Sequence, residues 1–507
     1  MEKQPFKKTS YKFPFYILLA CVLAGAFVYN ARPSDVVIAP PLMKCPYDEP
    51  KVSPVSENRI RLGPILKDVT SNLVILPSAP QPNRPESDTA MMKWRQTSNI
   101  MYVLGEYYIA KSLVIVDPKC DSVCLTIVLP VQSAREIAFE GQVPDVEALK
   151  EQYDVQSVIF MDELPKLLIG QTVLSTSKDA LEPVPKTIQE QLTAAKAEIK
   201  YDVNVEQAFI RSRFIKTKPE IEMLKFSSKI AAFSHKWAER RIKYDRDVTE
   251  SVLASFFEYT SALCYNRLQG YNPIVGAGGH SAVLHYPTGE TQDSGYKHIG
   301  KKDLILIDAA GAYKGYASDL TRTYARKDSK KRDVLVSIVL HAQKAGISAY
   351  KEGNMLSQVT DLTILHLLAG LVKYDFFTTD NLDTLVASGV ISIFMPHGIS
   401  HPIGLDVHDP VPTIWTAKEQ TFTGLRNEYP LKAKYDYQLT KGQLHTVEPG
   451  IYFIPYLLDQ ARNNATKAVN DLINWETVDK FKDIGGVRIE DVVGIDYDGN
   501  TIVITEL

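Results

Sequence analysis

The sequence has few cysteines, and they follow no pattern that would build a fold. Only 5 of its 507 residues are cysteine, which excludes a small disulfide-built scaffold and leaves a hydrophobic core to hold the chain together. Cys21 lies in an apolar run, and the other four are Cys45, Cys120, Cys124 and Cys264. Cys120 and Cys124 flank a predicted turn between two strand-like runs, where they could form a bridge or stay two buried thiols.

The chain also lacks an excess of positive charge. It carries 57 basic and 60 acidic residues, a formal net charge of -3, so it has no basic field to neutralise a nucleic-acid backbone. The charged runs KDSKKRD and ERRIKYDR are typical of solvated helix ends and loops. Nucleic acid is therefore excluded as a partner, and the lack of an internal repeat excludes a solenoid.

One uncharged apolar run stands near the N-terminus. Residues 13–29, FPFYILLACVLAGAFVY, follow MEKQPFKKTSYK, which has four lysines and one glutamate. This pattern predicts a targeting or anchoring segment over residues 1–35 with its lysines in the cytoplasm. The run lies at the lower edge of a membrane-spanning length and exceeds a usual signal-peptide core, so an uncleaved signal anchor is favoured over cleavage after Ala26. The rest of the chain would be membrane-anchored by a single pass and lumenal or extracellular, or secreted if the segment is cleaved.

Composition divides the remaining chain into a tether and two domains. Residues 36–57 are rich in proline, as tethers are. From 58 to 195, short β-rich runs alternate with helical stretches, which predicts a smaller mixed α/β domain; the runs are NLVILP, SLVIVDP, CLTIVLP and VQSVIFM. Apolar residues recur at helical spacing from Glu220 onward, which predicts a long helix near the start of a larger domain over 196–507. A hydrophobic content of 45% suits two folded domains.

Four acidic residues of the larger domain lie at the ends of predicted strands or inside them. The segment DLILIDAAGAYKGYASDLTRTYA predicts a hairpin whose first strand ends at Asp308 and whose return strand is entered at Asp319. Glu448 precedes Pro-Gly in HTVEPGIYFIP, and Glu490 lies in the strand-like GGVRIEDVVGID. Either aspartate alone is more often a turn residue. An apolar strand that ends in a carboxylate nevertheless indicates a cation at that end.

These acidic residues and one histidine form a candidate metal site. Four carboxylates in one pocket would repel one another and raise their pKa values, whereas two divalent cations would balance their four charges. Oxygen ligands with a single imidazole favour Mn, with Co or Zn as alternatives, and no cysteine has suitable spacing to join. The predicted ligands are Asp308, Asp319, His401, Glu448 and Glu490.

The motifs that carry these residues resemble those of a known family. The Asp308/Asp319 hairpin, HGISHPIGLDVHD, TVEPGIY and GGVRIED together look like the aminopeptidase P and prolidase group of pita-bread metallopeptidases. The chain is most similar to eukaryotic prolidases, through SAVLHY, MPHG, VEPGIYFI and GGVRIED. The resemblance runs from about residue 58 to residue 507. It implies an α/β (α+β) fold, with a smaller N-terminal domain before a pita-bread catalytic domain, and a homodimer.

The resemblance also implies how the ligands are shared. Asp308 would chelate one ion, Asp319 and Glu490 would bridge both, and His401 with Glu448 would bind the other. A water molecule or hydroxide between the two ions would be the nucleophile. Glu448 would also accept the proton of that water.

Other residues of the motifs would act on the substrate. His408 would stabilise the tetrahedral oxyanion or pass a proton to the leaving nitrogen. His285 and His397 resemble the histidines of the family's substrate site, and Arg488 resembles an arginine that supports the metal ligands from outside. Two further histidines, His280 and His298, match no motif and are assigned structural roles, and no role is assigned to His445.

The resemblance implies a substrate with proline in the second position. An Xaa-Pro bond is a tertiary amide without an N–H and with a locked φ, so an enzyme that grips extended backbone through that donor binds it poorly. Family members act on dipeptides, as prolidase does, or on longer peptides, as aminopeptidase P does; dipeptides are favoured here. Dipeptide selectivity needs a cation for the free carboxylate. The family's arginine has no clean counterpart, and Arg426, Lys432 or Lys434 could substitute for it.

A second class of function is a pita-bread module that has lost catalysis and binds peptides or protein partners. Degenerate relatives of that kind lose metal ligands. Retention of all five ligand positions together with His408 favours the enzyme.

Overall fold

The computed structural model describes residues 44–80, 93–245, 247–289, 295–327, 329–415, 436–463 and 465–506. Nearly all of them belong to one compact unit, Pro46–Leu507, and Met1–Cys45 is a second unit. Among the described residues, no helix has the length and apolar character that crossing a bilayer requires. The predicted signal segment 1–35 lies outside the described residues.

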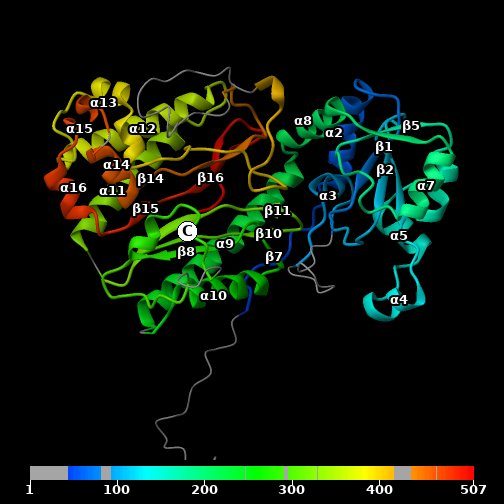
Figure 1. Cartoon of the computed structure of the whole chain (residues 1–507), viewed down its shortest axis with the longest axis horizontal. Helices are drawn as coiled ribbons and strands as arrows, with labels where there is room; N and C mark the ends of the chain where they lie inside the picture. Colours follow the sequence, from blue (N-terminus) through cyan, green and yellow to red (C-terminus); the bar gives the residue numbers. More distant parts are fainter. Residues whose placement is uncertain are drawn as a thin grey trace, which may run out of the picture. The chain divides into compact units, whose positions relative to one another are not determined.

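A six-stranded sheet forms the core of the N-terminal domain (Figure 1). Its strand order is β4-β3-β2-β1-β5-β6, antiparallel among β1, β2 and β3 and parallel toward both edges. The strands are β1 Val74–Pro77, β2 Leu113–Asp117, β3 Cys124–Leu129, β4 Ser157–Phe160, β5 Thr172–Ser175 and β6 Glu198–Tyr201. The four β-rich runs of the sequence are confirmed as β1 to β4. Apolar runs became strands here because the central strands are covered on both faces.

Seven helices accompany this sheet in the described part of the chain: α2 Val55–Lys67, α3 Ser98–Leu104, α4 Ala134–Glu140, α5 Val146–Tyr153, α6 Leu164–Leu167, α7 Lys186–Ala194 and α8 Val203–Phe214. The sheet continues past residue 195, where the sequence predicted the first domain to end, because β6 pairs with β5. Residues 196–201 therefore belong with the N-terminal sheet. An exposed edge strand with charged side chains carries no apolar pattern, so the sequence did not reveal it.

The turn between β2 and β3 is closed by a disulfide. Cys120 and Cys124 are bonded, with their Cα atoms 5.6 Å apart, a separation typical of disulfides. Of the two alternatives that the sequence left open, the structure has the bridge.

The larger C-terminal domain contains several short sheets and two pairs of long helices. Its strands are β7 Leu268–Gln269, β8 Ile274–Ala277, β9 Leu304–Asp308, β10 Gly311–Tyr313, β11 Tyr316–Ala317, β12 Thr321–Ala325, β13 Leu444–Val447, β14 Gly450–Tyr452, β15 Gly486–Arg488, β16 Asp491–Ile495 and β17 Thr501–Val503. Its helices are α9 Lys218–Tyr244, α10 Glu250–Leu263, α11 Lys330–Ala349, α12 Leu356–Lys373, α13 Leu382–Ser388, α14 Pro455–Asn463, α15 Lys467–Asn470 and α16 Trp475–Phe481.

The long helix predicted from Glu220 onward is confirmed as α9. Thr217 caps its first turn by accepting from the backbone N–H of Glu220, and the Glu220 carboxylate accepts from the N–H of Thr217. Pro219 occupies a position in that turn where no donor is needed. These local signals start the helix, and its apolar face then packs onto the strands.

Each helix pair covers one half of the strands (Figure 1). Helices α9 and α10 share a core with β8 and β9, which includes Ile242, Phe257 and Ile307. Helices α11 and α12 share the larger core with β13 to β16. The two halves meet where Thr321 of β12 bridges to Glu490, between β15 and β16. This junction brings the strand ends of both halves together.

The predicted hairpin that carries the two aspartates is present, and a smaller hairpin lies between its two strands. Strands β9 and β12 are antiparallel, with Asp308 opposite Thr321. Between them β10 and β11 form a second, smaller hairpin in another sheet. Lys314 and Gly315 turn this small hairpin with φ values of 48° and 87°, the positive angles of a two-residue hairpin turn in which glycine is favoured.

A buried ion-pair network holds the loop that carries the site histidines. The carboxylate of Asp409 lies 2.5 Å from Nη2 of Arg213 and 2.8 Å from Nζ of Lys216. The side chains of Lys216 and Asp409 are both 1% exposed. Arg213 also contacts Asp406, which accepts from Ser98 of the N-terminal domain. The network therefore joins the domains through the loop that contains His401 and His408.

We expect Asp409→Asn to lower the free energy of unfolding by about 3–5 kcal/mol, because the change leaves the buried cations Arg213 and Lys216 under-compensated. Urea unfolding followed by circular dichroism measures it. The matched control is Asp479→Asn, which removes a carboxylate from an exposed pair with Arg462 and should barely move the unfolding midpoint. Equal, small shifts in both variants would show that the network does not hold the loop.

Candidate metal centre

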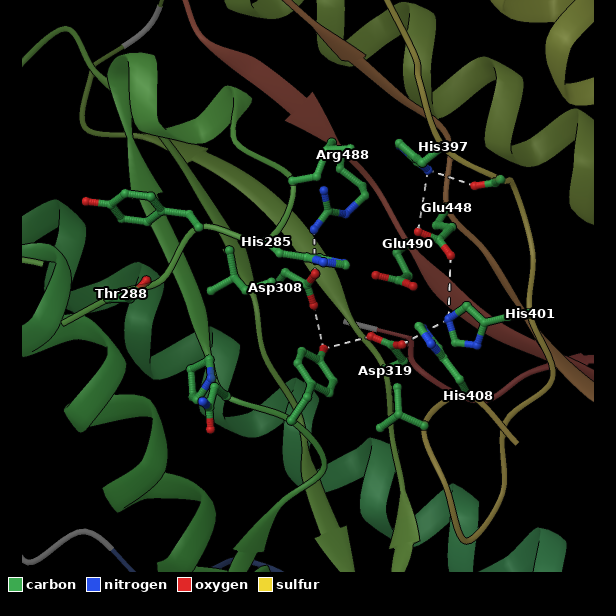
Figure 2. A pocket seen from close by; sticks show the side chains of 18 of the residues that line it. His285, Thr288, Asp308, Asp319, His397, His401, His408, Glu448, Arg488 and Glu490 are labelled. Carbon is green, nitrogen blue, oxygen red and sulfur yellow. Dashed lines mark hydrogen bonds and ion pairs between the residues drawn. The ribbon is translucent and has the colours of Figure 1, made fainter. Parts of the chain in front are cut away.

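The five predicted ligands come from four separate stretches of chain and converge on one cavity (Figure 2). Asp308 ends β9, and Asp319 lies just before β12. Glu448 lies between β13 and β14, and Glu490 between β15 and β16. His401 lies in the loop before β13, where its backbone N–H bonds the hydroxyl of Thr446. Each ligand lies in a strand end or loop, where a side chain can turn away from the sheet.

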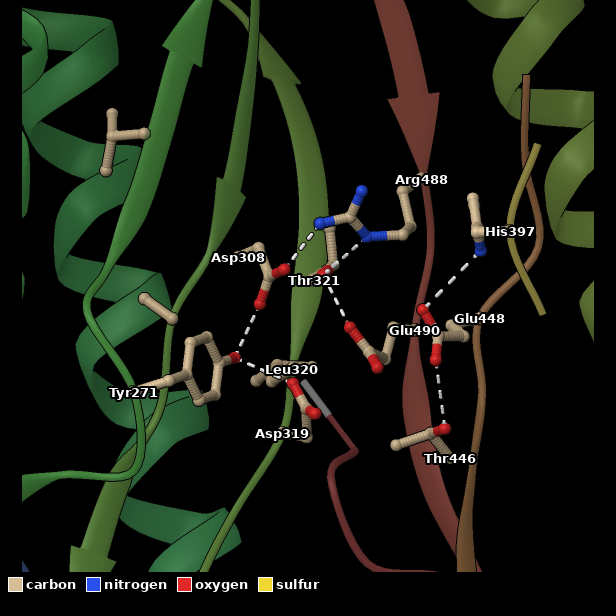
Figure 3. Close-up of polar contacts among 12 residues, drawn as sticks. Tyr271, Asp308, Asp319, Leu320, Thr321, His397, Thr446, Glu448, Arg488 and Glu490 are labelled. Atoms are coloured by element: carbon tan, nitrogen blue, oxygen red, sulfur yellow. Dashed lines mark hydrogen bonds and ion pairs between the residues drawn. The ribbon is translucent and has the colours of Figure 1, made fainter. Parts of the chain in front are cut away.

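Three of these residues come close enough to share one ion. Ligand atoms of Asp319, His401 and Glu490 all lie within 4.8 Å of one another. Nε2 of His401 is 3.3 Å from Oδ2 of Asp319 and 3.5 Å from Oε1 of Glu448. Asp308 joins them on the other side, where one tyrosine hydroxyl contacts both it and Asp319 (Figure 3).

That tyrosine, Tyr271, was not predicted from the sequence. Its hydroxyl lies 2.5 Å from Oδ1 of Asp308 and 2.7 Å from Oδ1 of Asp319. Burial and the carboxylate charges raise its pKa well above the ordinary value, so it remains a donor. Tyr271 lies three residues before β8, whose first residue pairs with Asp308. Only this strand pairing, which is absent from the motif, could have revealed it.

Arg488 supports two of the carboxylates through hydrogen bonds (Figure 3). Its guanidinium donates to Asp308, to the hydroxyl of Tyr452 at 3.0 Å and to that of Thr321 at 3.2 Å. Thr321 in turn donates to Glu490 at 2.6 Å. One arginine thus holds two predicted ligands, one directly and one through a threonine.

The carboxyl groups in the cavity would be stabilised in their ionised form by cations. Burial raises the pKa of Asp308, with Asp319 adding to the effect against the opposing charge of Arg488. Burial raises the pKa of Glu448 to about 7. Burial and the neighbouring carboxylates raise the pKa of Glu490 well above its usual range. These carboxyl groups resist ionisation together, and bound divalent cations would remove that conflict. The donor set therefore fits divalent metal ions.

Among the candidate ligands, His401 is the imidazole, and the neighbouring carboxylates favour its protonated form. Burial alone would lower its pKa, but the hydrogen bond with Asp319 and the charge of Glu448 outweigh burial and raise it to about 9. Nδ1 of His401 lies 3.1 Å from the carbonyl of Pro402. That contact orients the ring so that Nε2 faces the carboxylates, as a metal ligand must.

The other predicted histidines line the same cavity of about 850 Å³. The ring of His408 lies 4.2 Å from that of His401, centroid to centroid. Nε2 of His397 is 2.9 Å from the hydroxyl of Tyr452, and burial beside Arg488 lowers the pKa of His397 to about 3. His285 faces the cavity from the loop after β8. The neutral His397 can therefore act as a hydrogen-bonding group rather than as a charge.

The histidines without a motif lie elsewhere. His445 is buried between the hydroxyls of Tyr350 and Tyr437, each 2.6 Å from a ring nitrogen. His298 pairs with Asp247 on the surface, and His280 contacts the buried Glu250. The three residues proposed for a substrate carboxylate, Arg426, Lys432 and Lys434, lie outside the described residues.

Two family models match the chain. Metallopeptidase family M24 matches residues 222–496, and the aminopeptidase P N-terminal domain matches residues 56–178. The chain belongs to metallopeptidase family M24. The resemblance seen in the motifs is thus confirmed, and this M24 protein is an enzyme rather than an inactive binding module. The family implies divalent metal ions.

Curated relatives of this M24 metallopeptidase include enzymes with two kinds of name. The Xaa-Pro dipeptidase of Homo sapiens is 28% identical over 461 residues, 87% of each chain. The Xaa-Pro dipeptidase 2 of Idiomarina loihiensis is 33% identical over 57% of this chain and 62% of its own. A probable Xaa-Pro aminopeptidase of Podospora anserina is 28% identical over 81% of this chain and 85% of its own.

Solved structures share the fold of this M24 metallopeptidase. Aminopeptidase PepP of Pseudomonas aeruginosa superposes with a TM-score of 0.71 at 23% identity, over 89% of this chain and 95% of that one. Aminopeptidase P of E. coli, in its low-pH form, gives 0.70 at 22% identity, over 90% and 96%. The expected two-domain mixed α/β fold is therefore confirmed.

We expect Asp319→Asn or Glu490→Gln to reduce the number of metal ions that the M24 domain retains and to abolish turnover. A neutral amide cannot balance the charge of a divalent ion as a carboxylate would. Metal content after dialysis, read by elemental analysis, measures the loss. Asp479→Asn is the control, because it removes a carboxylate from an exposed pair with Arg462 that lies outside the cavity lining. Unchanged metal content in both ligand variants would remove these carboxylates from the site.

Proposed function

We propose that this M24 metallopeptidase removes an N-terminal residue from proline by hydrolysing the Xaa-Pro bond, with dipeptides as its main substrates. The convergence of Asp308, Asp319, His401, Glu448 and Glu490 beside His408 carries the proposal. The names of the curated relatives support the Xaa-Pro bond as the target. Both dipeptidases and aminopeptidases occur among those names, so action on longer peptides is the alternative.

Two divalent ions, which we propose to be manganese, would occupy the five-ligand site. The oxygen-rich donor set with one imidazole supports a hard or intermediate metal. When bound, such ions lower the pKa of a water molecule and polarise the scissile carbonyl.

Residues of the chain would perform the proton transfers. The Glu448 carboxylate accepts from the Thr446 hydroxyl at 3.2 Å, which steers one of its oxygens while both remain in the cavity. Glu448 would take the proton of the attacking water. His408, beside His401, would donate to the oxyanion or to the leaving nitrogen.

The cavity walls would position the peptide. His285 would offer a ring nitrogen to the substrate's carbonyl groups, while the neutral His397, held by the carbonyl of Gly398 and the hydroxyl of Tyr452, would contact the substrate with its ring. Proline in the second position brings no N–H to satisfy, and the apolar side chains of Leu284, Pro287 and Val407 line the cavity beside these polar groups. These apolar walls beside the polar centre suit a compact, rigid residue such as proline.

We also propose that the enzyme works outside the cytosol, held to a membrane by residues 1–35 or secreted after their removal. The lysine-rich start and apolar run support this placement. The Cys120–Cys124 disulfide supports an oxidising compartment. A homodimer remains a proposal from the family resemblance alone.

The decisive experiment compares Ala-Pro with a longer peptide that begins Ala-Pro, using purified metal-loaded protein with and without chelator. Release of alanine that chelator abolishes supports the proposal. Cleavage of Ala-Pro alone assigns a dipeptidase, and cleavage of the longer peptide assigns an aminopeptidase. If both peptides stay intact with metal bound, the proposed Xaa-Pro hydrolysis is wrong.

For His408→Ala we expect kcat to fall roughly a hundredfold or more, the usual scale for the loss of an acid–base or oxyanion group. Bound metal should be unchanged, because His408 is outside the five-ligand set. Steady-state kinetics with the better peptide, together with metal analysis, tests both statements. Wild-type kcat in the variant would exclude His408 from the reaction.

A further inference from the structure

One loop of the catalytic domain delivers a substrate-site histidine and contains no regular strand or helix of its own beyond a short 3-10 turn. It runs from Gly278, after β8, to Thr288 and includes His285. We call residues 278–288 the His285 loop. Five of its residues, from Leu284 to Thr288, line the cavity. A loop in that position needs a support that fixes where His285 points.

The two ends of the His285 loop are pinned to neighbouring strands. The hydroxyl of Ser281 accepts from the N–H of Gly486 in β15 at 2.8 Å. A Cβ on Gly485 would lie 2.0 Å from the carbonyl oxygen of Gly278, so glycine is required for this close approach. At the far end Thr288 accepts from the N–H of Val275 at 2.8 Å. These contacts fix the ends but not the middle, where His285 lies.

The middle of the loop is tied to a carboxylate buried beneath it. Glu250, the first residue of α10, is 0% exposed. Its oxygens accept from the N–H of Ala277 at 2.7 Å and from the hydroxyl of Tyr286 at 2.8 Å. Nδ1 of His280 lies 2.9 Å from the same carboxylate. Tyr286 is the direct neighbour of His285, so its tether fixes the backbone from which His285 projects.

His280 and Tyr286 also support each other. Their rings are stacked, with centroids 4.6 Å apart and planes inclined by 26°. A buried carboxylate is costly unless hydrogen bonds satisfy it, and the side-chain donors to Glu250 among the described residues are these two rings. The three side chains therefore support one another. The Glu250 carboxylate orients both rings, and the polar groups of the rings satisfy its hydrogen-bonding capacity.

We infer that Glu250, His280 and Tyr286 form a positioning clamp that holds His285 in the substrate site. The clamp residues are positioning residues, because they act through His285 and not on the reacting atoms. His280, to which the sequence assigned only a structural role, thereby acquires a part in substrate binding. This inference rests on the proposed function insofar as it uses turnover, but the placement of His285 can be measured without turnover.

The test replaces His280 by Phe, which keeps a ring over Tyr286 and removes the nitrogen that meets Glu250. We expect KM for the cleaved Xaa-Pro peptide to rise roughly tenfold, the scale of one lost hydrogen bond to a charged group, with kcat changed by less than about threefold. His280→Asn keeps a donor at the position of Nδ1 and should restore most of the lost affinity. Tyr286→Phe removes the other side-chain donor to Glu250 and should raise KM by a similar factor.

A double-mutant cycle separates positioning from general damage. Once His285→Ala has removed the group being positioned, adding His280→Phe should raise KM no further. An equal rise in both backgrounds would overturn the clamp, as would an unchanged KM in the single variant. Metal content and the unfolding midpoint are recorded for each variant, to identify any variant that misfolds. If His280→Phe misfolds, Tyr286→Phe takes its place in the cycle.

A second readout does not depend on activity. The ring signals of His285 in the NMR spectrum, assigned by their loss in His285→Ala, should shift or broaden in His280→Phe and return in His280→Asn. Unmoved signals would overturn the clamp whether or not the enzyme cleaves Xaa-Pro peptides. Absence of turnover in the wild type with the shift present would instead refute the proposed function and leave the clamp standing.

Discussion

The repulsion among four buried carboxylates is the constraint on which the rest of this structure depends. Asp308, Asp319, Glu448 and Glu490 line one cavity, and burial raises the pKa of three of them. Such a cluster is costly in a folded protein unless cations compensate it. Arg488 and a protonated His401 supply part of the compensation, and divalent ions supply what these two cannot. The donor set therefore fits the divalent metal ions that the family implies.

The arrangement of the strands keeps these carboxylates together. Two sets of strands, each backed by its own pair of helices, meet at the bridge between Thr321 and Glu490. The bridge aligns strand ends that are far apart in sequence, and Arg488, Thr321 and Tyr271 then fix the carboxylates by hydrogen bonds. Asp409 anchors the histidine loop in a similar way through buried cations. Rigid support of this kind is what a metal site needs for accurate geometry.

The sequence singled out the acidic residues that converge on the cavity, but not the residues that support them. Asp308, Asp319, Glu448 and Glu490 stand out because acidic residues are unexpected at the ends of apolar strands. Strands β1 to β4 and helix α9 were also visible, because their apolar periodicity is strong. The contacts of Tyr271 with two predicted ligands, and of His280 with the buried Glu250, were not predicted. Their roles depend on contacts between distant segments, such as the pairing of β8 with Asp308, which no local pattern encodes.

The most direct test of the account is calorimetric titration of metal-stripped protein with Mn²⁺ near pH 6.5, in two buffers of different ionisation enthalpy. His401 and Glu448, with pKa values raised to about 9 and about 7 in the protein without metal, hold protons at that pH and must lose them as ligands. The account predicts two ions per chain, release of at least one proton, and affinity that rises with pH. Heats that are identical in both buffers, or no saturable binding of Mn²⁺, would contradict it.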